Sequence, residues 1–271
     1  MTSSEAKPQS RFVEVNGLRL HYQEWSDQGP PLIFLHGVTS SCETWSVIAP
    51  RFAADYRVLV FDLRGHGQSD KPDAGYAWEP HYAADIAEFI SGSLSEPAIV
   101  VGHSLGGAVA APVAVSAGSG VRAIVMEDPP SFAHEDPDDR GSRFAPILAA
   151  RRMPMDDRVE AFMARDGMDR AAATVRAERL EAMNEQVLVE LLEGSTSYRP
   201  DDVFPHVACP ALVILGNPSR GGVVDWMDRP RLQRLLKGAS ILEWPDVGHG
   251  IHSQQPDRFV DELRAFFDTL S

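Results

Sequence analysis

The segment 97–115 places one serine between an apolar run and a stretch of small residues at helical spacing. Its centre, residues 102–106, reads Gly-His-Ser-Leu-Gly, with Ser104 in the middle. The pattern predicts a strand, a sharp turn and a helix, which is the context that lets a turn serine act as a nucleophile. The flanking glycines allow neighbouring chain to pass without a Cβ clash. The helix that follows would direct free N–H groups and its positive end at a developing oxyanion.

A serine hydroxyl is unreactive at its ordinary pKa and needs an adjacent base. His249 follows the last predicted strand, in a loop where glycines flank it, and Pro256 opens a helix shortly afterwards. His249 is therefore the candidate base, and the neighbouring His252 is interpreted as a bystander.

The elements that must position these side chains are visible as apolar runs and helical patterns. Residues 32–35 are continuously apolar, which is typical of a strand covered on both faces, and further buried strands are predicted at 57–61, 97–101, 121–126 and 211–215, with a last strand at 239–244. Helices are predicted at 45–52, 80–93, 229–237 and after Pro256. Two alternating runs around Asn-Gly at 16–17 predict a hairpin, and residues 1–10 are predicted to be a frayed tail. Strands alternating with helices predict a mostly parallel sheet, whose ligands bind at the carboxyl ends of the strands.

Residues 131–200 differ from the rest because they contain no buried strand. An acidic loop at 134–139 precedes helical patterns at 142–152, 156–164 and 170–193. An all-helical insertion between two strands must lie over one end of the sheet, and its Met and Phe side chains suit a hydrophobic ligand. We therefore expect a core of residues 1–130 and 201–271 and a helical cap, or lid, of residues 131–200.

Composition narrows the classes of partner. The 271 residues include 25 basic and 39 acidic side chains, a formal net charge of −14, which argues against nucleic acid and anionic membrane surfaces. Two cysteines without metal-ligand spacing predict neither a disulfide framework nor a zinc site, and no cofactor is expected. The polar first ten residues and the absence of an apolar run of about 18 residues predict no secretory signal, no membrane span and a cytoplasmic location. A homodimer is possible.

Four motifs follow one another along the chain. They are His-Gly at 36–37, Asp-Leu-Arg-Gly-His-Gly-Gln-Ser at 62–69, Gly-His-Ser-Leu-Gly-Gly at 102–107 and Gly-His at 248–249. In this order and these strand contexts the sequence resembles the α/β-hydrolase superfamily over almost its whole length. The resemblance implies an α/β fold with about eight mostly parallel strands, helices on both faces and a helical cap after strand six. It also implies Ser104 as nucleophile, His249 as base, and the backbone N–H groups of Val38 and Leu105 as the oxyanion hole.

The acid of the triad departs from the commonest family pattern. Most members carry it after strand seven, in Gly-x-x-Asp, where this chain has Gly-Asn-Pro-Ser at 216–219. A second arrangement, as in haloalkane dehalogenases and zearalenone-type lactonases, places the acid after strand six, which here ends in Glu127 and Asp128. Counting along the chain favours Asp128. Adjacent strand residues point to opposite faces, so only one of the two can reach His249, and Glu127 stays the alternative acid. Asp225, in the loop after strand seven, is a third possibility.

These assignments predict a serine hydrolase, an esterase or lactonase, that cleaves a carboxylic ester or lactone of a hydrophobic small molecule through an acyl-enzyme. A serine at position 104 argues against the aspartate-nucleophile chemistry of haloalkane dehalogenases and epoxide hydrolases. Carbon–carbon bond hydrolysis or perhydrolysis by the same triad remains open, as does a ligand receptor on a hydrolase fold with little turnover.

Overall fold

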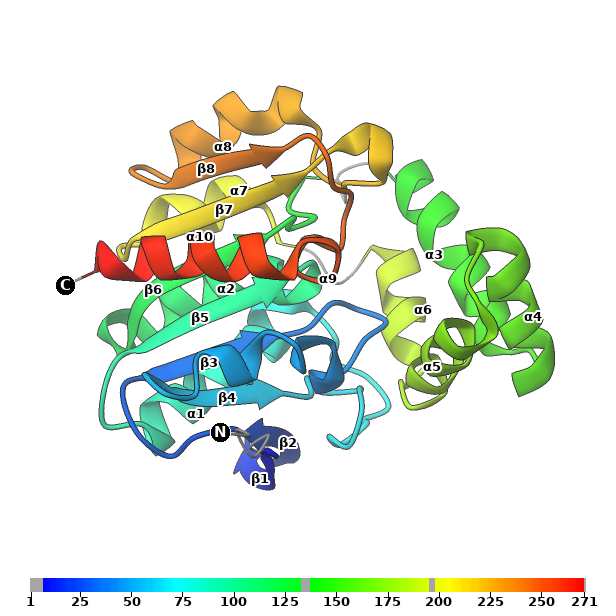
Figure 1. Ribbon diagram of the computed structural model, residues 1–271, viewed down its shortest axis with the longest axis horizontal. Helices are drawn as coiled ribbons and strands as arrows, with labels where there is room; N and C mark the ends of the chain where they lie inside the picture. Colours follow the sequence, from blue (N-terminus) through cyan, green and yellow to red (C-terminus); the bar gives the residue numbers. More distant parts are fainter. Residues whose placement is uncertain (1–6, 133–136, 195–197, 271) are drawn as a thin grey trace, which may run out of the picture.

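A computed structural model describes residues 7–132, 137–194 and 198–270 (Figure 1). Eight strands form one sheet in the order β1-β2-β4-β3-β5-β6-β7-β8. The strands are β1 (Gln9–Val15), β2 (Leu18–Glu24), β3 (Pro31–Leu35), β4 (Arg57–Phe61), β5 (Ala98–His103), β6 (Val121–Glu127), β7 (Ala211–Gly216) and β8 (Ser240–Trp244). The pairs β1–β2 and β2–β4 are antiparallel and all the others are parallel.

The hairpin of β1 and β2 turns at Asn16 and Gly17. Both residues have positive φ, 48° and 74°, as the two central residues of a tight hairpin turn require. The predicted frayed tail at 1–10 is wrong at its end: β1 starts at Gln9, which pairs with Glu24 of β2. Residues 1–6 lie outside the described part of the chain.

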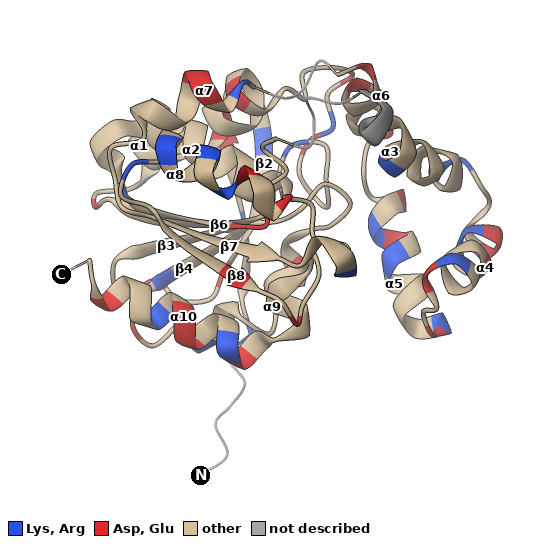
Figure 2. Cartoon of the chain, turned by 90° about the horizontal axis from the view of Figure 1, so that it is seen from above, with Lys and Arg blue, Asp and Glu red and all other residues tan. Residues whose placement is uncertain are grey.

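Helices cover both faces of the sheet. Figures 1 and 2 show α10 (Pro256–Asp268) on one face and α1 (Ala84–Ser93), α2 (Leu105–Ala117) and α8 (Arg229–Leu235) on the other. Successive residues of β3 alternate between the two cores: Ile33 and Leu35 join one apolar cluster, and Leu32 and Phe34 join the other. Burial on both faces explains why this strand is continuously apolar.

Three helix predictions differ from the structure. The helix expected at 45–52 is two 3-10 turns, Cys42–Trp45 and Ala49–Arg51, and the one at 80–93 begins as a π-helical segment, Trp78–Ala83, before α1. The long pattern at 170–193 divides into α5 (Arg170–Glu181) and α6 (Gln186–Glu193). Asn184 causes the division, because its side chain accepts a hydrogen bond from the Gln186 amide and donates one to the Pro72 carbonyl.

In the described part of the chain between β6 and β7, four helices precede the short α7 (Pro200–Val203): α3 (Pro137–Arg151), α4 (Met155–Asp166), α5 and α6. Figure 1 shows them beyond the end of the sheet to which the parallel strands point. The short α7 leads back towards β7. Because the strand ends carry the motifs of the sequence, this helical insertion faces the candidate site.

Among the described residues, none of the helices is both long enough and apolar enough to cross a membrane.

Candidate active site

Ser104 occupies the turn between β5 and α2 in a strained conformation. Its φ of 52° and ψ of −115° lie outside the regions that a residue with a Cβ ordinarily adopts. Hydrogen bonds hold the turn in place: the Ser104 amide donates to the Glu127 carbonyl, and the Gly106 amide donates to the His36 carbonyl. The strain is thus maintained by the two strands on either side of β5.

The two glycines of the motif are required by close backbone contacts. A Cβ on Gly102 would lie 2.1 Å from the Gly106 carbonyl oxygen, and one on Gly106 would lie 2.3 Å from the Leu35 carbonyl oxygen. Neither position has room for a side chain, because the opposing atoms are backbone. The glycine spacing therefore follows from how tightly α2 approaches β3 and β5.

His249 is held by a buried carboxylate at the end of β6. Its Nδ1 lies 2.7 Å from Asp128 Oδ2, and because a carboxylate only accepts, Nδ1 carries the proton and Nε2 is the basic nitrogen. Asp128 also accepts hydrogen bonds from the amides of Gly216 (3.1 Å) and Val223 (2.9 Å). The carboxylate is fully buried, whereas the side chain of His249 is 31% exposed. This pairing fixes the tautomer that a general base for Ser104 needs.

Ser104 and His249 line the same cavity, of about 280 Å³. Within the described residues the Ser104 hydroxyl has no recorded hydrogen-bond partner. Contacts between a nucleophile and its base are often long without substrate and shorten in the complex.

Glu127, the alternative acid, pairs with a different histidine. Its Oε1 accepts from the His252 amide (2.8 Å), and its Oε2 lies 2.8 Å from His252 Nδ1. Burial by itself would raise the pKa of Glu127, but the electrostatic influence of His252, that of His103 and the hydrogen bonds from His252 bring it below its ordinary value. The structure therefore places Asp128, not Glu127, beside His249, and the catalytic role of Asp128 stays a prediction.

His103, which precedes Ser104, was not identified from the sequence as part of the site. Its Nε2 lies 3.0 Å from the His249 carbonyl oxygen, so that nitrogen donates. Burial lowers the pKa of His103 to about 3, which keeps the ring neutral. Together with Glu127 and His252 it offers three potential metal-ligand atoms within 4.8 Å, but the Glu127 carboxylate and His252 Nδ1 already bond to each other and His103 Nε2 bonds to the His249 carbonyl. The group fixes the loop of His249.

The peptide between Gly37 and Val38 is oriented by a neutral histidine. The Leu63 amide donates to His36 Nε2, so His36 Nδ1 carries a proton and donates to the Gly37 carbonyl oxygen (2.7 Å). Burial lowers the pKa of His36 to about 3, which preserves this tautomer. Because C=O and N–H of a trans peptide point in opposite directions, the Val38 N–H is directed away from His36.

The second predicted oxyanion donor is the N–H of Leu105, at the start of α2. Within the described residues no acceptor is recorded for this amide or for that of Val38, as expected for donors that await a ligand. Val38 lines the cavity, and the Leu105 side chain is buried in the core.

The cavity combines the strand ends with the helical insertion. Its core side is formed by the loop 37–40, Ser104, His249 and Val223, and α3 and α5 complete it. α3 contributes Arg143, Phe144 and Ile147, and α5 contributes Arg176. The sequence offered no signal for these two arginines, because many arginines are spread along the insertion.

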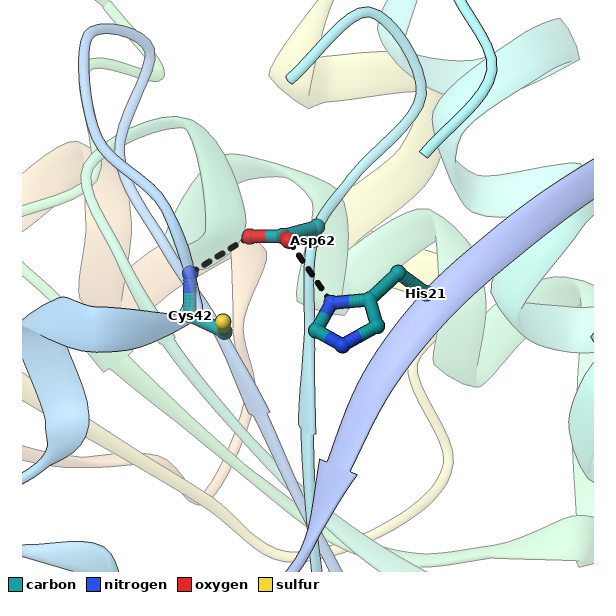
Figure 3. A group of neighbouring side chains, drawn as sticks. All are labelled: His21, Cys42 and Asp62. Carbon is teal, nitrogen blue, oxygen red and sulfur yellow. Dashed lines mark hydrogen bonds and ion pairs between the residues drawn. The ribbon is translucent and has the colours of Figure 1, made fainter. Parts of the chain in front are cut away.

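The other acidic motif of the sequence is structural. Figure 3 shows Asp62 between His21 and the backbone nitrogen of Cys42: its Oδ2 lies 2.8 Å from His21 Nδ1, and its Oδ1 accepts from the Cys42 amide at 2.7 Å. Oδ2 also accepts from the Gln68 amide, so the carboxylate joins three segments of chain. Burial raises the pKa of the Cys42 thiol far above its usual range, and a protonated thiol is a poor metal ligand.

Neither Asp225, the third candidate acid, nor Ser219 lines the cavity. Ser219, at the position where most members carry the acid, donates to the Asn217 side chain. The Asp225 side chain accepts from the Met227 amide and so caps a short 3-10 turn.

Comparison with known proteins gives a consistent family. One similar protein is the N-formylmaleamate deformylase of Pseudomonas putida, which is 28% identical over 264 residues, covering 94% of this chain and 95% of that protein. Another is the non-heme chloroperoxidase of Streptomyces lividans, which is 28% identical over 272 residues, covering 93% of this chain and 96% of that protein. Among solved structures, E-2-(acetamidomethylene)succinate hydrolase superposes with a TM-score of 0.82 at 24% identity, covering 96% of this chain and 99% of that one. Residues 32–262 match the family described as alpha/beta hydrolase. The predicted fold class is confirmed, and the chain belongs to the alpha/beta hydrolase family.

Proposed function

We propose that the protein is a serine hydrolase that cleaves a carboxylic ester or lactone through an acyl-enzyme on Ser104. One observation carries the proposal: a strained serine at the head of α2 shares a cavity with a histidine whose Nδ1 is held by a buried carboxylate. Membership of a hydrolase family supports hydrolysis in general but does not specify the bond; that this bond is an acyl–oxygen bond is our proposal.

In the first half-reaction His249 Nε2 takes the hydroxyl proton of Ser104 while Oγ bonds to the substrate's carbonyl carbon. The negative charge on the carbonyl oxygen is stabilised by the N–H groups of Val38 and Leu105; losing one such donor typically costs about a hundred- to a thousandfold in rate. Collapse of this intermediate breaks the bond to the leaving oxygen, which receives the proton from His249.

Water completes the second half-reaction. His249 removes a proton from the water, whose oxygen adds to the acyl carbon; the Ser104–acyl bond then breaks and the proton returns to Ser104 Oγ. Asp128 keeps the imidazole in the tautomer required for both steps and stabilises its charged form.

The same acyl-enzyme can be formed from an acyl–nitrogen bond, and this is the second candidate function. A relative named as a deformylase, matched over 94% of this chain, favours it. The two candidates differ only in the leaving atom that His249 protonates, so an ester, a lactone and an N-acyl substrate tested side by side would rank them.

We also propose that residues 131–200 act as a cap over the site, because α3 and α5 supply part of the cavity wall. The protein would bind a small-molecule substrate between cap and core.

Ser104→Ala is the decisive test of the nucleophile. We expect the variant to lose at least about 10⁴-fold in kcat towards a 4-nitrophenyl ester, since the proposed covalent intermediate forms on the Ser104 hydroxyl. A fluorophosphonate should add one adduct to the wild type and none to Ser104→Ala. Ser40→Ala, in the same cavity, is the matched control and should still be labelled.

Two outcomes would contradict the proposal. Unchanged turnover in Ser104→Ala would exclude this mechanism, and labelling of the wild type without turnover of any ester, lactone or N-acyl substrate would indicate a ligand receptor.

A further inference from the structure

Charge in the candidate site is opposite to that of the protein as a whole. The chain has a net charge of −14, yet none of the described residues that line the cavity is Asp or Glu, while Arg143 and Arg176 both are lining residues. The rest of the wall is mainly apolar, including Pro130, Phe144 and Ile147. A small cavity with apolar walls and guanidinium groups suits a ligand that carries a negative charge.

Arg176 is held in place by two contacts that leave some of its N–H donors without a recorded acceptor in the described part of the chain. Its Nη1 lies 2.6 Å from Asp166 Oδ2, and its guanidinium carbon lies 4.6 Å from the ring centre of Phe162. Within the described residues no hydrogen bond is recorded for Nε or Nη2. A guanidinium has five N–H donors in a planar fork, so the free edge can bind a carboxylate through two parallel hydrogen bonds.

Asp166 does not cancel the positive charge, because it is shared between two arginines. It pairs with Arg165 through Nε at 2.8 Å as well as with Arg176. One carboxylate between two guanidinium groups leaves a net positive charge at the cavity. Burial is the main influence that lowers the pKa of Arg176, and an anionic ligand would relieve it.

A structural arginine of the same helical layer shows the contrast. Arg158 is 2% exposed and donates from Nε, Nη1 and Nη2 to four backbone carbonyls, those of Ala150, Ala177, Arg151 and Met153, and it pairs with Glu181. Every nitrogen of its guanidinium has a partner within the protein. Arg176 is arranged differently: among the described residues its Nη1 has partners, and none is recorded for its Nε or Nη2.

Arg179 extends the positive surface by one helical turn. It lines a neighbouring hollow that shares Thr39, Ser40 and Arg176 with the active-site cavity. Within the described residues no hydrogen bond or ion pair is recorded for its side chain. The hollow is also lined by Asp169, whose side chain accepts from the Ala172 amide, so its two arginines outnumber its one acidic residue and the approach between the loop 39–40 and α5 has an excess of positive charge.

We propose that Arg176, together with Arg143, binds a free carboxylate of the substrate, so that the preferred substrates are anionic: esters, lactones or N-acyl compounds that carry a carboxylate a few bonds from the scissile acyl group. The proposal rests on the proposed function for the bond that is cleaved, but not for the binding of the anion. It adds a negative charge to the hydrophobic small molecule expected from the sequence.

Turnover of two matched esters tests the charge preference. Mono-4-nitrophenyl glutarate carries the free carboxylate, and its methyl ester is the neutral counterpart; rates are taken after subtraction of the uncatalysed reaction. For the wild type we expect kcat/KM to favour the anionic ester. In Arg176→Met the ratio of the two values should fall about 10- to 100-fold, which is what a lost charge-assisted pair typically costs.

Two further variants keep this test informative. Arg176→Lys preserves the charge without the fork and should give an intermediate ratio. Arg170→Met removes the same charge from the same helix at an exposed position that pairs with Glu160, and its ratio should equal that of the wild type. A wild type without charge preference, or an equal loss for both esters in Arg176→Met, would overturn the proposal.

Binding without turnover separates this inference from the proposed function. Calorimetry with the Ser104→Ala variant should show that glutarate binds, that glutaramide does not, and that adding Arg176→Met abolishes glutarate binding. Arg176-dependent binding by a protein whose wild type cleaves neither ester would support the carboxylate site and contradict the hydrolase. Ester turnover without glutarate binding would support the hydrolase and contradict the carboxylate site.

Discussion

The protein contains two acid–histidine pairs that begin at adjacent residues of one strand end. Asp128 pairs with His249 and Glu127 with His252, at 2.7 Å and 2.8 Å respectively. Both carboxylates are fully buried, but the His249 side chain is 31% exposed and that of His252 only 3%. By composition and distance the two pairs are nearly the same.

The two pairs differ in the surroundings of the imidazole Nε2, the nitrogen that does not face the carboxylate. His249 lines the cavity that holds Ser104, whereas His252 Nε2 lies 3.0 Å from Thr44 Oγ1 and its ring stacks on Trp45 at 4.3 Å. The pair of Glu127 and His252, here called the inner pair, thus has both ring nitrogens of the histidine bonded within the protein and does not line the cavity. A buried carboxylate and a histidine are not sufficient for general base catalysis: the second nitrogen must reach the reacting group.

Replacing Asp128 by Asn gives the largest expected difference between the pairs. We expect a loss of about 10⁴-fold in kcat, because an amide that donates to Nδ1 would select the wrong tautomer of His249. Steady-state kinetics on a 4-nitrophenyl ester measures this, with circular dichroism to check that the variant is folded.

Glu127→Gln is the matched change in the inner pair, and it should reduce stability more than it reduces kcat. We expect roughly 2 kcal/mol less stability, because a charge-assisted buried hydrogen bond is lost, and a far smaller loss of kcat than in Asp128→Asn. Chemical denaturation of both variants supplies the comparison. If Glu127→Gln abolished turnover and Asp128→Asn did not, the assignment of the two pairs would have to be exchanged.

The pH dependence of stability gives the smallest effect. Despite burial, His252 and His103 hold the pKa of Glu127 below its ordinary value of 4.5 in the folded protein. Ionised Glu127 therefore stabilises the fold above that pH, and the contribution is lost as the pH falls through the folded-state pKa. The gap in unfolding free energy between wild type and Glu127→Gln should be constant near neutral pH and narrow below about pH 4.5. A gap that widens on acidification would contradict the sign of the shift.

The elements around the site were predictable because their signals are local. Continuous apolar runs such as β3 reflect burial on both faces, and the Asn-Gly turn forces the hairpin. Helix boundaries were less predictable. Asn184 divides the pattern at 170–193 through hydrogen bonds to a loop more than a hundred residues away, and a contact of that kind leaves no periodicity in the sequence.

The sequence by itself determined the turn of the candidate nucleophile, Ser104, and its order relative to the candidate base, since glycine spacing and strand–turn–helix patterning are properties of neighbouring residues. It also limited the partner of His249 to a few carboxylates. Only the tertiary structure decided which of them lies beside that histidine: Asp128, directly after β6, meets His249, whereas Glu127, the last residue of β6, meets His252. Packing likewise decides which arginines line the cavity. Arg143 of α3 and Arg176 of α5 lie in the same cavity as Ser104 only because the insertion folds over the strand ends.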